Sequence, residues 1–169
     1  MTCIVCDTGP LTHLWQIDLW AAFSAFNTIH LADQVVRELK QHVALKRLKK
    51  LAGCALKIHI VSQDQIESAK KLISPLILES ADLATFSLAQ KLWPDFVLTD
   101  DLTLRQTLDD QKQKPMGSVG LLLYAYKAGL LNREELDQSI DRLFMHSTLY
   151  LSPQFKSYVR KLISDKISE

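Results

Sequence analysis

Two short, largely apolar runs, far apart in the chain, each end at an aspartate and lead into a helical pattern. Residues 2–6 precede Asp7, and residues 95–99 precede Asp100 and Asp101. Runs of this kind are typical of strands that are buried on both faces of a sheet. Parallel strands need a crossover connection, which is usually a helix. The repeated order of strand, acid and helix therefore predicts an α/β fold with a parallel sheet covered by helices on both sides.

The rest of the chain extends this alternation. We expect further strands at 28–31 and 56–61, and helices at 11–26, from Asp33 onward, and at 63–73, 80–93, 102–111, 117–128, 133–144 and 154–167. Ser80 is the expected N-cap of the helix at 80–93. Together these elements predict a three-layer α/β/α sandwich with a central, mostly parallel sheet of four to five strands and extra C-terminal helices. We expect one domain over residues 1–150, with a helical extension over 151–169 packed on it.

The charges of the chain nearly balance. Its 169 residues include 20 Lys and Arg against 19 Asp and Glu, a formal net charge of +1. This balance excludes a protein whose whole surface attracts polyanions. The N-terminus lacks the basic region and cleavage signal of a signal peptide, and the most apolar later run, 119–131, is interrupted by Lys127. That run is also shorter than the roughly 20 residues that cross a bilayer, so we expect a cytoplasmic protein without a membrane span.

Five acidic residues lie at strand ends or near helix starts. They are Asp7, Glu38, Asp82, Asp100 and Asp101. If the first and fourth strands are neighbours, Asp7 and the Asp100–Asp101 pair share one edge of the sheet, where α/β folds bind their ligands. Packed carboxylates repel one another, and a divalent cation relieves that repulsion. Oxygen-only ligands favour Mg²⁺ or Mn²⁺. Taken singly, each acid has a simpler interpretation, because acids also cap helices, as Asp82 would in a first turn.

Five short motifs occur in order along the chain. They are IVCDTGPL at 4–11, VVREL at 35–39, ADLA at 81–84, LTDD at 98–101 and GSVGLL at 117–122. Each is weak alone, but together they resemble the PIN-domain proteins, and among these the bacterial and archaeal relatives of the VapC toxins of toxin–antitoxin pairs. The resemblance covers roughly residues 2–150. The triplet Asp7-Thr8-Gly9 also matches aspartic proteases, but those need an all-β scaffold and a second triplet.

The resemblance implies an endoribonuclease that depends on Mg²⁺ or Mn²⁺. Carried over position by position, the catalytic and metal-binding acids are Asp7, Glu38, Asp82 and the Asp100–Asp101 pair. Two positions stay open. The fourth acid is Asp101 in the commonest family pattern, with Asp100 as the alternative. The third is Asp82 or Glu79, because this chain lacks the Gly-Glu pair that many relatives have near that helix start.

Several other side chains are candidates for contact with the substrate or its phosphates. They are Thr8, Thr99, Ser118, Arg37 and Arg105. The two threonines fall where the family often has hydroxyls near the metal. Ser118, at a helix start, either binds phosphate or caps the helix. The arginines either hold the RNA backbone or pair with the acids. The densest basic run, Lys46–Lys50, is either an RNA contact or a solvated helix face.

The expected partners are an RNA substrate, an antitoxin protein and a second copy of the chain, because PIN-domain relatives often form homodimers. The alternative function is a non-catalytic PIN-fold module that binds RNA or protein. Retention of the acid positions favours the nuclease, since a binding module gains nothing from carboxylates that repel one another.

Overall fold

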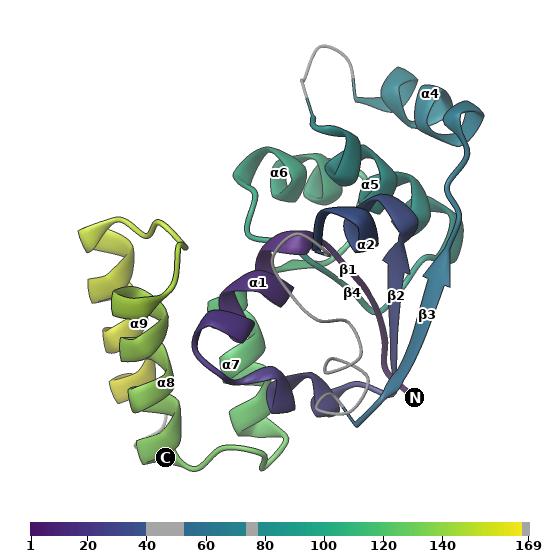
Figure 1. Cartoon of the computed structure of the whole chain (residues 1–169). Helices are drawn as coiled ribbons and strands as arrows, with labels where there is room; N and C mark the ends of the chain where they lie inside the picture. Colours follow the sequence, from purple (N-terminus) through teal and green to yellow (C-terminus); the bar gives the residue numbers. More distant parts are fainter. Residues whose placement is uncertain (40–52, 74–77, 167–169) are drawn as a thin grey trace.

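A five-stranded parallel sheet lies at the centre of the computed structural model, which describes residues 1–39, 53–73 and 78–166 (Figure 1). Neighbouring strands follow the order β3-β2-β1-β4-β5. The strands are β1 (Cys3–Cys6), β2 (Thr28–Ala32), β3 (Ala55–His59), β4 (Phe96–Leu98) and β5 (Pro115–Met116). The predicted parallel sheet is thus confirmed. The predicted basic run Lys46–Lys50 lies outside the described residues.

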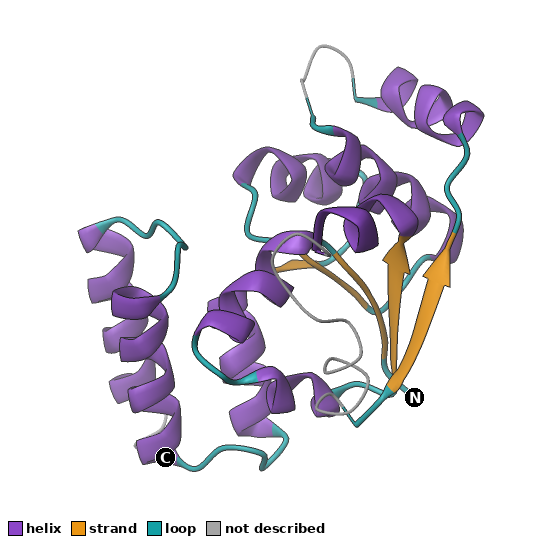
Figure 2. Ribbon diagram, viewed as in Figure 1, coloured by secondary structure: helices purple, strands orange, loops and turns teal. Residues whose placement is uncertain are grey.

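Helices cover both faces of the sheet, which confirms the three layers (Figures 1 and 2). Helix α5 packs on β1 and β2 from one side. On the other side Tyr124 of α7 stacks on Phe26, with ring centroids 5.0 Å apart, and meets Phe96 of β4 edge-on at 5.6 Å. The helices are α1 (Thr8–Gln16), the 3₁₀ helix η1 (Trp20–Ala25), α2 (Asp33–Leu39), α4 (Gln63–Leu72), α5 (Ser80–Leu92), α6 (Leu102–Asp110), α7 (Ser118–Lys127), α8 (Arg133–His146) and α9 (Pro153–Lys166).

The strand register brings the carboxyl ends of β1 and β4 together. Cys6 pairs with Leu98, and the backbone N–H of Asp7 donates to the Leu98 carbonyl at 2.9 Å. Asp7 and Thr99, the residues that follow the two strands, are therefore neighbours. The condition on which the shared acidic edge depended, that the first and fourth predicted strands are neighbours, is therefore met.

The single helix predicted at 11–26 is wrong, because α1 ends at Gln16 and η1 follows. Asp18 adopts a left-handed backbone with φ 54°. Its N–H donates to the Trp15 carbonyl, and the Leu19 N–H donates to the Leu14 carbonyl. These two bonds form a Schellman motif, in which Asp18 takes the place usually held by glycine. The apolar spacing continues through the break, so periodicity alone did not indicate it.

Helix α5 starts at Ser80 as predicted, but its N-cap differs from the prediction by one residue. Glu79, not Ser80, is the N-cap, and its N–H donates to Asp82 Oδ2 at 3.3 Å. This bond closes the first turn around Glu79, so Ser80 becomes the first helical residue. The position of the N-cap matters because it determines how the side chains of Glu79 and Asp82 are placed at the start of α5.

Helix α8 packs beside α1 and α7. Val159 and Ile163 of α9 are buried in the same hydrophobic core that contains β1 and α5. Among the described residues, none of the helices has the length and apolar character needed to cross a membrane.

Candidate active site

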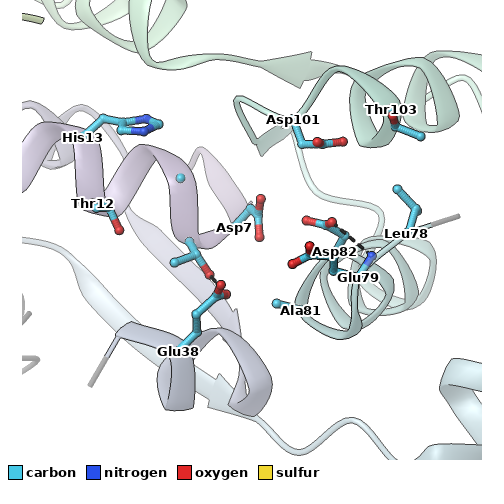
Figure 3. A pocket seen from close by; sticks show the side chains of 12 residues that line it. Asp7, Thr12, His13, Glu38, Leu78, Glu79, Ala81, Asp82, Asp101 and Thr103 are labelled. Atoms are coloured by element: carbon cyan, nitrogen blue, oxygen red, sulfur yellow. Dashed lines mark hydrogen bonds between the residues drawn. The ribbon is translucent and has the colours of Figure 1, made fainter. Parts of the chain in front are cut away.

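A pocket of about 510 Å³ opens beyond the carboxyl ends of β1 and β4 (Figure 3). It lies at the edge of the sheet that the sequence indicated. Among the described residues its lining contains no Lys or Arg, and its acidic members are Asp7, Glu38, Glu79, Asp82 and Asp101. The structure thus brings together acids that are up to 94 positions apart in the chain.

Asp7 is the most deeply buried of these acids, with 5% of its surface exposed. Thr99 Oγ1 donates to its Oδ2 at 3.0 Å, and Thr85 Oγ1 donates to its Oδ1 at 3.4 Å. Burial, and next the charge of Asp82, raise the pKa of Asp7 from 3.8 to about 7. Hydroxyls orient this carboxylate, but they leave its negative charge largely uncompensated.

Glu38 reaches the pocket from α2. Val35, Val36 and Leu39 of that helix are buried in the core, and Glu38 lies on another side of it, as its position in the sequence predicted. Thr8 Oγ1 donates to Glu38 Oε2 at 2.6 Å, which ties α2 to the start of α1. Figure 3 shows Glu38 across the pocket from Asp82.

Asp82 and Glu79 enter the pocket from the start of α5, so both candidates for the third acid are present. Asp82 is half-buried, and Glu79 is exposed. Burial, and next the charge of Asp101, raise the pKa of Asp82 to about 6. Asp82 is also the strongest charged influence on Asp7. These electrostatic links favour Asp82 over Glu79 as the acid that acts with Asp7.

Asp100 and Asp101 are adjacent in the chain but lie in different surroundings. Asp101 lines the pocket; its Oδ1 accepts the Leu104 N–H at 2.7 Å and so caps α6. Asp100 lies outside the pocket lining. Its carboxylate accepts hydrogen bonds from His13 Nδ1 at 2.7 Å, from the Ser118 N–H at 2.7 Å and from Ser118 Oγ. The structure therefore brings Asp101, and not Asp100, to the other acids.

A family model for the PIN domain matches residues 3–165 of the chain. The chain belongs to the PIN-domain family. PIN domains are generally nucleases and typically use divalent metal ions. The match continues beyond residue 150, where the resemblance stated from the sequence ended, and includes most of α9. No curated protein matches this PIN domain in sequence.

The predicted substrate contacts of this PIN domain divide between the pocket and other places. Thr8 lines the pocket. Thr99 is fully buried beneath Asp7, so it supports that carboxylate and cannot touch a substrate. Ser118 is also fully buried, and its hydroxyl donates a hydrogen bond to Asp100. Of the arginines, Arg37 forms an exposed ion pair with Asp33, and Arg105 lines a separate, largely apolar groove beside α7 and α9.

Three pocket features were not predicted from the sequence. Thr85 supports Asp7 from the buried face of α5, where a threonine gives no local sign of its role. Thr12 and His13 of α1 line the pocket, one turn beyond Thr8. The five histidines lack metal-ligand spacing, and this pattern did not single out His13.

The donor set of the pocket fits a divalent cation. Carboxylate oxygens are the ligands that Mg²⁺ and Mn²⁺ prefer, and the raised pKa values of Asp7 and Asp82 reflect negative charge that a cation would offset. Within the described residues, no three His, Cys, Asp or Glu side chains are already grouped closely enough to enclose an ion. Mg²⁺ commonly binds through one or two carboxylates and keeps several waters, so a loose set of acids suits it.

Proposed function

We propose that this PIN domain is a metal-dependent endoribonuclease that hydrolyses RNA phosphodiester bonds. One observation carries the proposal: the buried carboxylate of Asp7 lies in a pocket that further acids line and that has no Lys or Arg among its described lining residues. Carboxylates gathered in this way repel one another and destabilise the folded protein. A bound divalent cation would offset that repulsion, and this favours a cation-binding role for the pocket.

In this proposal the acids Asp7, Glu38, Asp82 and Asp101 hold Mg²⁺ or Mn²⁺. When bound, such an ion lowers the pKa of a coordinated water and offsets charge on the phosphate. The protein orients the acids. Thr99 and Thr85 hold the two oxygens of Asp7, and Thr8 holds Glu38. Because these hydroxyls come from separate elements, the carboxylates are positioned before substrate arrives.

Asp100 is outside the proposed ligand set. All three of its hydrogen bonds connect the end of β4 to α1 and α7. We assign it a positioning role, and we keep Glu79 at the rim of the pocket, because its side chain is exposed.

The test is cleavage of a labelled mixed-sequence RNA with Mg²⁺, Mn²⁺ or EDTA, comparing the wild type with Asp7→Asn. Asp109→Asn is the matched control, since Asp109 is an exposed acid near the end of α6 and outside the pocket. We expect metal-dependent cutting by the wild type and by Asp109→Asn, and loss of it in Asp7→Asn. Folded protein that binds RNA, yet never cleaves it under any metal, would instead support the non-catalytic binding module.

We further propose that the RNase is the toxin of a toxin–antitoxin pair, that it acts in the cytoplasm and that it forms a homodimer. The resemblance of its motifs to the VapC relatives supports this proposal. Induced expression should arrest cell growth, and co-expression of a small protein encoded beside it should restore growth. Growth arrest by Asp7→Asn to the same extent would count against the toxin role, and light scattering tests the dimer.

A further inference from the structure

The imidazole of His13 is the one nitrogen-bearing ring among the described residues that line the acidic pocket. It projects from α1 on the side of the pocket away from Asp82 and Glu79 (Figure 3). Its side chain is 13% exposed, and that of its partner Asp100 is 9% exposed. The ring is therefore held in place at the pocket wall and is not a freely rotating surface group.

The hydrogen bonds of Asp100 determine the tautomer of His13. Ser118 supplies two donors to the Asp100 carboxylate, its N–H at 2.7 Å and its Oγ. The Asp100 carboxylate therefore acts as an acceptor. His13 Nδ1, 2.7 Å from Asp100 Oδ2, is then the donor. In the neutral ring the second nitrogen, Nε2, carries a lone pair and accepts hydrogen bonds.

Nε2 has no hydrogen-bond partner within the described residues, whereas Nδ1 already donates its hydrogen bond to Asp100. Because Asp100 lies outside the pocket lining and the ring itself lines the pocket, the uncommitted atom is the one left for a ligand. Gly9 lies beside this ring, and a Cβ there would be at an ordinary contact distance, 3.6 Å, from His13 Cε1 and from Asp100 Cβ.

A neutral acceptor beside a phosphodiester site selects for a hydrogen-bond donor on the substrate. The phosphodiester itself carries no donor at neutral pH, and neither does a deoxyribose ring within a strand. The N–H donors of the bases occur in RNA and DNA alike, so they do not distinguish the two. A ribose carries one at every nucleotide, the 2′-hydroxyl, and this group distinguishes RNA from DNA. Unlike a carboxylate, a neutral ring nitrogen accepts this bond without adding repulsion toward the phosphates.

We propose that His13 Nε2 accepts a hydrogen bond from a ribose 2′-hydroxyl and makes the pocket select RNA over DNA, with Asp100 and Ser118 as positioning residues. This inference rests on the proposed ribonuclease function, and it names how that pocket recognises its substrate.

Two variants separate substrate contact from structural support. His13→Asn retains an amide N–H near the position of Nδ1, which can still donate to Asp100, but it has nothing at the position of Nε2. His13→Gln reaches the position of Nε2 with an amide oxygen, a hydrogen-bond acceptor, but loses the donor at Nδ1. If His13 only supports the fold, Asn is the better replacement. If it contacts the ribose, Gln is the better replacement.

The experiment compares a short single-stranded RNA with the DNA of the same sequence and with RNA that carries one 2′-deoxy nucleotide at each position in turn. Binding is measured by fluorescence anisotropy in Ca²⁺, and cleavage is measured in Mg²⁺. We expect the wild type to prefer RNA, and one 2′-deoxy position to weaken the interaction roughly tenfold. In His13→Asn that same position should have no effect, and His13→Gln should retain part of it. Thermal melting checks that each variant is folded.

The cleavage assay tests the ribonuclease proposal, and the binding assay tests the His13 proposal separately. If the wild type cleaves no RNA but binds RNA better than DNA through His13, the ribonuclease proposal fails and the 2′-hydroxyl contact stands. Equal or undetectable binding of RNA and DNA by the wild type would overturn the His13 proposal. So would a 2′-deoxy effect in His13→Asn as large as in the wild type. The ¹⁵N shifts of the His13 ring add a direct check, since Nε2 should be unprotonated in the wild type and Asp100→Asn should change this signature.

Discussion

The hydroxyl of Thr99 donates a 3.0 Å hydrogen bond to the buried carboxylate of Asp7, although the two residues are 92 positions apart. The same hydroxyl accepts the N–H of Asp101 at 3.1 Å. One oxygen atom therefore sets the position of one acid and the backbone of another. A substitution at Thr99 therefore tests the support of Asp7 and of Asp101 together.

Thr99→Val should lower both stability and RNA cleavage, because it keeps the side-chain shape and removes the shared hydroxyl. Each buried polar group left without a partner costs about 1–3 kcal/mol, so we expect a loss of that order in urea unfolding. Cleavage should fall roughly tenfold or more, since the acids lose their orientation. Thr99→Ser is the matched control and should remain close to the wild type. A valine variant with wild-type stability would contradict the role assigned to this hydroxyl.

The stability of the metal-free protein should fall as pH rises from about 4 to about 7. Burial raises the pKa of Asp7 to about 7, while the unfolded chain releases that proton near its ordinary value of 3.8. Between these pH values the folded state binds more protons than the unfolded state, so a rising pH favours unfolding. Asp7→Asn should remove the part of this slope that Asp7 contributes, leaving the part that comes from the raised pKa of Asp82, and should be more stable than the wild type at pH 8, by up to about 4 kcal/mol.

The measurement is urea unfolding in EDTA at pH 4 to 8 for the wild type and Asp7→Asn. The two should converge at the acidic end, where Asp7 is protonated in both states. Because groups that do not interact with Asp7 titrate alike in both proteins, the difference between the curves isolates Asp7 and the acids coupled to it. Parallel curves would show that the charge of Asp7 is already compensated.

Mg²⁺ should stabilise the wild type at pH 8, because a ligand that binds only the folded state shifts the unfolding equilibrium. The melting temperature should rise with Mg²⁺ or Mn²⁺ and return to its starting value with EDTA. Asp7→Asn and Asp82→Asn should respond weakly, and Asp109→Asn should respond like the wild type. Sodium chloride at the same ionic strength controls for general screening. An equal response in all four proteins would place the ion elsewhere.

Gly117→Ala should destabilise the protein, because a Cβ at this position would lie 3.0 Å from Asp100 Oδ1 and 3.1 Å from Arg105 Nη1. We expect a loss of roughly 1–3 kcal/mol, typical of overpacking in a buried site. Gly9→Ala is the matched comparison, since its nearest neighbours would be 3.6 Å away, an ordinary contact distance. Thermal melting of both variants checks the pair, and equal melting temperatures would contradict the close packing at Gly117.

The sequence predicted the sheet well where the signal was local. Buried runs before Asp7 and Asp100 indicated strands, and their parallel direction followed from the helices between them, whereas their pairing with each other is a finding of the structure. The break between α1 and η1 was missed, since Asp18 adopts its left-handed conformation within an unbroken apolar pattern. Strand β5 has two residues, Pro115 and Met116, which is too short to leave an alternation.

For the candidate site, the acids were easier to predict than their partners. Asp7 and Asp101 follow strands, and position alone marks them. The choice between Asp100 and Asp101 depends on what each side chain meets, and Asp100 meets His13, which is 87 positions away. No local pattern carries such a contact. For the same reason Arg37 and Arg105 were candidates by nearness in sequence, yet Arg37 pairs with Asp33 and Arg105 lies at another groove.

The pairing of β1 with β4 has a consequence for the protein during its synthesis. Asp7 leaves the ribosome early, but its neighbours Asp82, Thr99 and Asp101 are made much later. Contacts so distant in sequence cannot form before both segments have emerged. A chain still short of residue 101 therefore lacks Asp101, and the pocket around Asp7 is incomplete. If the protein cuts RNA as proposed, its own messenger is safe from the nascent chain until residue 101 has left the ribosome.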